Sequence, residues 1–159
     1  APTLDAAVLH RPGASFVTLT RNGNLRGCIG SLEAMRPLAE DVRENARAAA
    51  FADPRFPPLT RAELDGLRVE VSVLSAPRAL RVASEADAIA QLLPGVDGIV
   101  LRMGLRHATF LPQVWEQIPE PMSFLRALKQ KAGLPVEFWS PQLELSRYEV
   151  TKFVEPAAA

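Results

Sequence analysis

Asn22-Gly23 lies between two short stretches of strand-forming residues, and this pair constrains the fold of the N-terminal half more than any other feature. Asn-Gly is the strongest short signal for a two-residue hairpin turn, because both residues tolerate positive φ. Residues 16–20 and 25–31 are therefore predicted to pair as antiparallel strands. The returning strand begins with the run Leu-Arg-Gly-Cys-Ile-Gly at residues 25–30.

This run holds the only cysteine of the 159 residues, Cys28. Residues two apart in a strand share a face, so Arg26, Cys28 and Gly30 are expected to point the same way. A guanidinium near a thiol favours the thiolate, and glycine lets a ligand or another backbone come close. The run therefore predicts either a reactive thiol site or a tight core crossing, and the residues alone leave both open.

A two-residue turn also sets the register of the hairpin. It places Leu19 opposite Arg26 and Val17 opposite Cys28, which gives the thiol apolar neighbours. That arrangement favours Cys28 as a small buried hydrophobe. The competing interpretation is a nucleophile or metal-contacting thiol, with Arg26 as an anion binder or an aid to thiolate formation. Of the two histidines, His10 and His107, neither has a spacing that marks it as the base for such a thiol.

The rest of the chain predicts helices and strands without a regular βαβ rhythm. Helices are expected at residues 37–51, after Ser84 and at 121–132, and strands at 67–75, 98–103, 106–111 and, weakly, 143–154. Thr60 and Glu63 match a capping box. This pattern is typical of an α+β protein with a largely antiparallel sheet.

Composition excludes several classes of function. Lys+Arg and Asp+Glu both number 18, so the chain lacks the basic footprint of a nucleic-acid binder. It has no apolar run of about 18 residues, so no membrane span is expected. One cysteine excludes an internal disulfide framework and fits a cytoplasmic location. Without ligand spacing or a glycine-rich phosphate loop, we expect no metal and no nucleotide cofactor.

Several segments together resemble the AMMECR domain family. They are LRGCIG, AFADPRFPPL, LRVEVSVLS, ATFLPQVW and FLRALKQKAGL, in this order, and they cover about residues 16–139. The resemblance implies one domain over residues 1–159, with an antiparallel sheet of about five strands flanked by helices and a smaller second lobe. A helical segment that usually precedes the first strand in the family is expected to be absent, and residues 156–159 are expected to form a disordered tail.

The resemblance implies an enzyme or enzyme component of a three-part system, acting with a Memo-like protein and a radical SAM protein. A small-molecule substrate and a site centred on the LRGCIG cysteine follow from this reading. The alternative is a non-catalytic adaptor whose LRGCIG groove grips a peptide. A deep pocket around Cys28 would favour the enzyme, and a flat apolar patch above a buried Cys28 would favour the adaptor.

We expect the polar residues of these segments to meet at one cleft. Asp53 and Arg55 are read either as the rim of this site or as a loop lock, in which Asp53 caps and Arg55 bridges to it. Glu70 is either solvated or a general base. The expected catalytic residues are Cys28 and Glu70, and the expected substrate-binding residues are Arg26, Gly27, Gly30, Asp53, Arg55 and Gln113.

Overall fold

The computed structural model describes residues 3–156, which fold into two compact units. Residues 3–75 and 151–156 form the first unit, and residues 76–150 form the second. The chain passes from the first unit to the second after Ser75 and returns after Val150. Each unit has its own sheet and its own helices, so the two are described separately.

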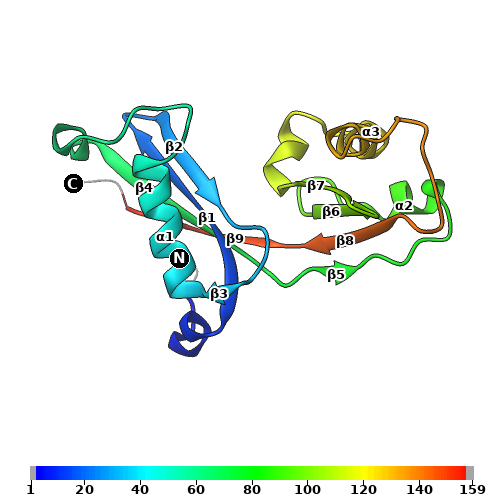
Figure 1. Ribbon diagram of the computed structural model, residues 1–159, viewed down its shortest axis with the longest axis horizontal. Coiled ribbons are helices and arrows are strands. Elements are labelled where there is room, and N and C mark those ends of the chain that lie inside the picture. The colour runs from blue at the N-terminus through cyan, green and yellow to red at the C-terminus, as the bar shows by residue number, and fades with distance from the viewer. Residues whose placement is uncertain (1–2, 157–159) are drawn as a thin grey trace. The chain divides into compact units, whose positions relative to one another are not determined.

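A five-stranded sheet forms the first unit, with the order β2-β1-β4-β9 and with β3 paired to β1 (Figure 1). The strands are β1 (Pro12–Arg21), β2 (Asn24–Gly30), β3 (Arg36–Pro37), β4 (Leu67–Leu74) and β9 (Val150–Val154). The helix α1 (Leu38–Phe51) packs on one face of this sheet. Two short 3-10 helices complete the unit, η1 (Ala6–His10) before β1 and η2 (Arg61–Leu64) before β4.

The predicted hairpin is present, but its register differs from the predicted one. Asn22 and Gly23 have φ of 52° and 83°, as a turn of this kind requires. A β-bulge then shifts the pairing, so that Leu19 faces Gly27 and Thr18 faces Cys28. The extra residue of the bulge is Arg26. The prediction that Val17 opposes Cys28 is therefore wrong, because a bulge moves every later pair by one residue.

One face of the sheet is apolar and lies against α1. Val17 and Leu19 of β1 are buried in a cluster with Ala49 of the helix. Gly27 lies at the closest approach: a Cβ placed there would stand 2.0 Å from the carbonyl oxygen of Ala49. The space left by this glycine is thus filled by the helix backbone, which explains why β2 and α1 can pack so tightly.

The inward face of α1 is more polar than its sequence predicts. Its spacing predicts an apolar stripe of Leu38, Val42, Ala46 and Ala49, but the fully buried positions are Leu38, Asp41, Asn45 and Ala49. The carboxylate of Asp41 accepts hydrogen bonds from the Ser15 and Ser31 hydroxyls at 2.6 and 2.8 Å and from Arg36 Nε at 2.9 Å. These bonds satisfy a carboxylate that burial would otherwise make costly.

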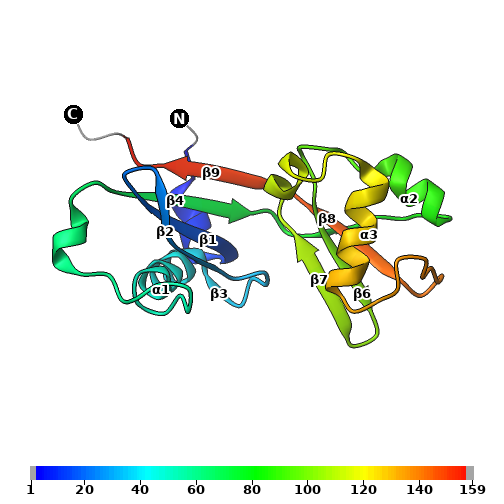
Figure 2. The same ribbon diagram turned by 90° about the horizontal axis from the view of Figure 1, so that it is seen from above.

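The second unit has a four-stranded antiparallel sheet in the order β5-β8-β6-β7. Its strands are β5 (Arg78–Ala79), β6 (Gly98–Met103), β7 (Arg106–Phe110) and β8 (Glu144–Tyr148). Its helices are α2 (Glu85–Gln91), α3 (Pro121–Lys131) and the 3-10 helix η3 (Pro112–Glu116). The helix α3 lies over β6 and β7 (Figure 2), and Phe124, Leu125 and Leu128 of this helix enter the core.

The structure bears on several predictions made from the sequence. The α+β class and the five-stranded antiparallel sheet are confirmed. The single weak strand predicted at 143–154 is two strands, because the chain leaves the second sheet at Tyr148 and joins the first at Val150.

The predicted disordered tail falls mainly on residues 157–159, which lie outside the described residues. Within the described part of the chain, no helix combines the length and the apolar character needed to cross a bilayer.

Gly27→Val is expected to lower the free energy of unfolding by about 1–3 kcal/mol or more, because a larger side chain must displace the backbone of α1. The measurement is the midpoint of denaturant unfolding. Leu25→Val, on the same strand but 44% exposed, introduces the same side chain without this clash. It should change stability by less than about 0.5 kcal/mol. Equal midpoints for the two variants would show that position 27 is open.

Candidate functional site

Cys28 is half-buried on the sheet face that points away from α1. Its Sγ lies 3.3 Å from the hydroxyl of Thr18, its partner on β1. On the other side of β1, Thr18 is paired with Glu70 of β4. Directly opposed residues share a face, so a thiol, a hydroxyl and a carboxylate stand side by side across three strands. We refer to these residues as the Cys28–Thr18–Glu70 row.

The residues next to the Cys28–Thr18–Glu70 row on the same three strands determine its surroundings. Towards the end of β2, Phe16 is paired with Gly30, and a Cβ on this glycine would lie 2.2 Å from the ring of Phe16. The ring therefore occupies the space that the sequence assigned to an approaching ligand. On β4, Arg68 lies two residues before Glu70 on the same face and donates a hydrogen bond to the carbonyl of Glu155.

The backbone of Cys28 is held from outside the sheet by Asp53 and Arg55. The carboxylate of Asp53, which is buried, accepts a hydrogen bond from Cys28 N–H at 3.0 Å. Arg55 binds the same carboxylate through Nε and Nη2 at 3.1 and 2.7 Å, and its Nη2 lies 3.5 Å from the Cys28 carbonyl oxygen. We call this pair the Asp53–Arg55 clamp. It takes the place of a neighbouring strand along the edge of β2.

Arg26 is committed to the loop between α1 and β4. Its Nε and Nη2 donate to the carboxylate of Glu63 at 2.6 and 3.1 Å, and Nη2 also donates to the Pro57 carbonyl at 2.7 Å. The bulge breaks the simple alternation that would have aligned Arg26 with Cys28. The guanidinium group held against the Cys28 backbone is that of Arg55.

Phe56 joins the two arginines. Its ring centroid lies 5.4 Å from the guanidinium carbon of Arg55 and 5.9 Å from that of Arg26. Cations close to an aromatic ring are attracted by its negative face. The loop thus links two ion pairs, Asp53 with Arg55 and Glu63 with Arg26, through one aromatic side chain.

These contacts shift the pKa values of the carboxyl groups. The hydrogen bond from Arg26, followed by that from the Thr60 backbone, lowers the pKa of Glu63 from 4.5 to about 2. The hydrogen bonds from the Arg55 side chain and from Cys28 N–H hold the pKa of Asp53 well below its usual range. Both carboxylates therefore stay ionised at neutral pH, as the ion pairs require.

The structure brings most of the predicted site residues into the first unit. Cys28 and Glu70 share a face of the sheet, and Asp53 and Arg55 bind the Cys28 backbone. Arg26 is paired with Glu63 of η2. Gln113 belongs to the second unit, on η3. Its convergence with the others at one cleft stays a prediction.

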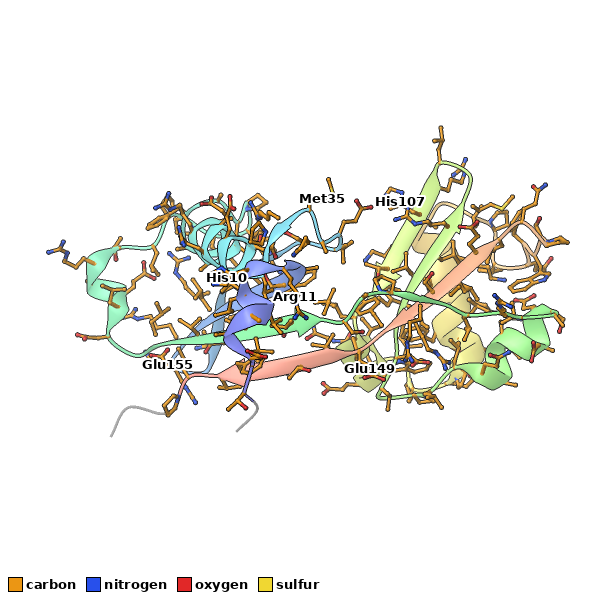
Figure 3. The ribbon with its side chains drawn as sticks, turned by 90° about the horizontal axis from the view of Figure 1, so that it is seen from below. His10, Arg11, Met35, His107, Glu149 and Glu155 are labelled. Atoms are coloured by element: carbon orange, nitrogen blue, oxygen red, sulfur yellow. The ribbon has the colours of Figure 1, made fainter. Side chains whose placement is uncertain are left out.

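Figure 3 shows the two histidines on different elements, His10 in η1 and His107 on β7. His10 is in the first unit and His107 in the second. Within residues 3–156, no group of three or more His, Cys, Asp or Glu side chains could hold a metal ion. The polar side chain in contact with the thiol is Thr18, and Glu70 lies on the other side of Thr18.

Sequence reasoning missed Thr18 and the second role of Glu63. Thr18 was hidden by the register, because a bulge at Arg26 has no strong local signal. Glu63 was recognised for its capping box, which is present, with Glu63 Oε1 accepting from Thr60 N–H at 3.1 Å. Its pairing with Arg26 joins residues 37 positions apart, which spacing does not reveal.

Glu63→Gln is expected to destabilise the protein at pH 7 and to flatten its acid unfolding. Because the folded pKa of Glu63 is lowered, its stabilising effect is present above about pH 4.5 and is lost as the pH falls towards 2. Denaturant midpoints between pH 7 and pH 2 measure this. Exposed Glu137, replaced by Gln, controls for the loss of one charge. Parallel pH curves for the wild type and Glu63→Gln would contradict the ion pair with Arg26.

Comparisons with known proteins agree on one family. The sequence model of the AMMECR1 family matches residues 2–153, a range that spans both units. A protein of Methanothermobacter thermautotrophicus is 44% identical over 144 residues, covering 88% of this chain and 74% of that protein. A protein of Thermotoga maritima is 39% identical over 148 residues, covering 92% of this chain and 80% of that protein.

A solved structure gives the same answer for the fold. The crystal structure of the uncharacterised protein PH0010 from Pyrococcus horikoshii superposes with a TM-score of 0.81 at 33% identity, over 97% of this chain and 79% of that one. The family model and the solved structure thus each match nearly the whole length of this chain. The chain belongs to the AMMECR1 family.

Proposed function

We propose that this protein is an enzyme component whose reactive group is the Cys28 thiol, with Thr18 and Glu70 as its proton acceptors. The single observation that carries the proposal is the Cys28–Thr18–Glu70 row, in which Sγ lies 3.3 Å from the Thr18 hydroxyl. A nucleophilic cysteine needs a base or a cation to generate thiolate. The proposed base is the carboxylate of Glu70, which is paired with Thr18, and the proposed cation is Arg55, whose Nη2 lies 3.5 Å from the Cys28 carbonyl oxygen.

The reaction class is group transfer through sulfur. In the reacting state, the Glu70 side chain accepts a hydrogen bond from the Thr18 hydroxyl, since the Cβ atoms of an opposed pair are about 4.5–5.5 Å apart. The Thr18 hydroxyl then accepts the thiol proton while it gives its own to Glu70. The thiolate attacks an electrophilic carbon of the substrate. The S–C bond forms as the bond from this carbon to its leaving group breaks, and the leaving group takes the proton from Glu70.

Three properties of Glu70 support its part in this proposal. It lies on the same face as Cys28, it is half-buried, and it has no hydrogen-bond or ion-pair partner within the described residues. Asp53 and Glu63, in contrast, are each neutralised by an arginine and have lowered pKa values. Glu70 is thus the carboxylate in this row that remains available to accept a proton.

The resemblance described above supplies the cellular setting of the proposal. A Memo-like protein and a radical SAM protein are the proposed partners, and the cytoplasm is the proposed location. A small molecule is the proposed substrate. These points rest on the resemblance to the family alone.

One observation favours the alternative of a peptide-binding adaptor. The loop that follows β2 presents apolar side chains to solvent, with Met35 80% and Leu32 41% exposed. Figure 3 shows Met35 projecting outward from this loop. Exposed apolar side chains next to the LRGCIG strand are typical of a protein contact surface. In this alternative, Cys28 has only a packing role.

Native alkylation by iodoacetamide tests the proposal. Intact mass spectrometry follows the loss of free Cys28 between pH 6 and pH 9. We expect Cys28 to react in the folded protein, and Thr18→Val and Glu70→Gln to slow the reaction about ten-fold, as expected for the loss of one hydrogen bond to a charged group. Thr20→Val, in the next pair of the hairpin on the same face, should leave the rate unchanged.

Two results would overturn this proposal. A thiol that reacts only after denaturation leaves Cys28 as a packing residue and favours the adaptor. Reaction rates that are the same in the wild type, Thr18→Val and Glu70→Gln would show that the row does not deliver the proton.

A further inference from the structure

Arg55 presents the Nη1–Nη2 edge of its guanidinium group beside the backbone of Cys28, and the one contact on this edge is that of Nη2, 3.5 Å from the Cys28 carbonyl oxygen. Its Nε and Nη2 are bound to Asp53, whereas Nη1 has no hydrogen-bond partner within the described residues. The side chain is 55% exposed, so the free edge is accessible to a solute. Arginine has five N–H donors in a fixed plane, and two of them on one edge match the two oxygens of a carboxylate or phosphate.

The orientation of this edge is fixed before any ligand binds. Asp53 holds the guanidinium from one side, and its own carboxylate is anchored on Cys28 N–H. The ring of Phe56 supports it, with Arg26 held against the same ring by Glu63. Because the side chain is already ordered, binding an anion costs little conformational entropy.

The charges near Arg55 determine how strongly an anion is attracted to it. Asp53 offsets the charge of Arg55, and on β4, two strands from Cys28, Arg68 lies two residues from Glu70 on the same face. The region is therefore close to neutral. Directed hydrogen bonds to the free edge, and not a broad positive field, are what an anion finds here.

Arg55 lies against the backbone of the residue that carries the thiol, as the contact of its Nη2 with the Cys28 carbonyl oxygen shows. The hydrogen bond to Asp53, and then the charge of Asp53, raise the pKa of Arg55 above its usual value, so Arg55 stays a cation. A group bound to the free edge of Arg55 is thus next to Cys28, the residue that reacts in the proposed function.

We propose that Arg55 binds an anionic group of the substrate, a carboxylate or a phosphate, and places the adjacent carbon at Cys28. This inference rests on the proposed function, because it takes Cys28 as the reacting group. It assigns small anionic molecules as the substrate class. It also gives Arg55 and Arg26 different roles, since Arg26 binds the loop between α1 and β4.

A pair of reagents of nearly equal size tests this assignment. Iodoacetate carries a carboxylate and iodoacetamide does not, and both alkylate thiols by the same displacement of iodide. At low ionic strength, the iodoacetate-to-iodoacetamide rate ratio of Cys28 should exceed that of free N-acetylcysteinamide by about three-fold, the effect of one exposed ion pair. Arg55→Gln should reduce the ratio to that of the free thiol.

The control is Arg47→Gln, which removes an exposed arginine from α1 on the other face of the sheet and should keep the wild-type ratio. Circular dichroism verifies that each variant is folded. A second measurement uses the wild type alone, in case Arg55→Gln fails to fold. Inorganic phosphate should slow alkylation of Cys28 by iodoacetate more than sodium chloride at the same ionic strength, since phosphate competes for the same edge.

The outcomes separate this inference from the one it rests on. Inertness of Cys28 to both reagents overturns the proposed function, and the anion site with it. Reaction with iodoacetamide, together with a wild-type ratio no higher than that of the free thiol and no specific effect of phosphate, overturns the anion site alone. A raised ratio without phosphate competition assigns the edge to carboxylates, and a raised ratio with competition assigns it to both anions.

Discussion

The hydrogen bond from Cys28 N–H to the carboxylate of Asp53 is the interaction on which the candidate site depends. Cys28 lies on β2, an edge strand of the first sheet, whose outward amides need partners. Asp53 supplies one at 3.0 Å, and Arg55 turns this single bond into a clamp by binding the same carboxylate. The position of the thiol is therefore set by a loop that begins just after α1.

This clamp connects the reactive strand to the rest of the unit. Phe56 follows Arg55 and meets Arg26 of the bulge, and Arg26 meets Glu63 at the entrance to β4. The same loop thus closes the edge of β2, holds the bulge and leads into the strand that carries Glu70. A bulge placed next to a functional side chain is a common way to re-aim it. Here it replaces an apolar neighbour of Cys28 with the hydroxyl of Thr18.

Local signals in the sequence were sufficient for most of the fold. The Asn22-Gly23 turn, the capping box of Thr60 and the alternation along β4 each have a local physical cause, and each is present. The register beyond Arg26 has no such local cause. Arg26 of the bulge is paired with Glu63, 37 residues away, and a sequence pattern does not contain that contact.

The same difference between local and long-range signals applies to the candidate site. That Cys28, Asp53 and Arg55 lie together follows from the strand–helix–loop order of the chain. Period-two alternation places Glu70 on the polar face of β4, but Cys28 shares that face only because of the bulge, which pairs it with Thr18 and not with Val17. The buried Asp41 and Asn45 of α1 did not follow, because their partners Ser15 and Ser31 come from other segments. Long-range polar contacts are thus what the pattern of residues left undetermined.

Amide hydrogen exchange at Cys28 tests the central claim, the Asp53–Arg55 clamp, most directly. The exchange rate of this amide is measured by NMR in the wild type, in Asp53→Ala and in Asp53→Asn, which keeps an acceptor oxygen. The account predicts slow exchange in the wild type, strongly faster exchange in Asp53→Ala and partial protection in Asp53→Asn. Exchange in the wild type as fast as in an unstructured peptide, or unchanged in Asp53→Ala, would contradict it.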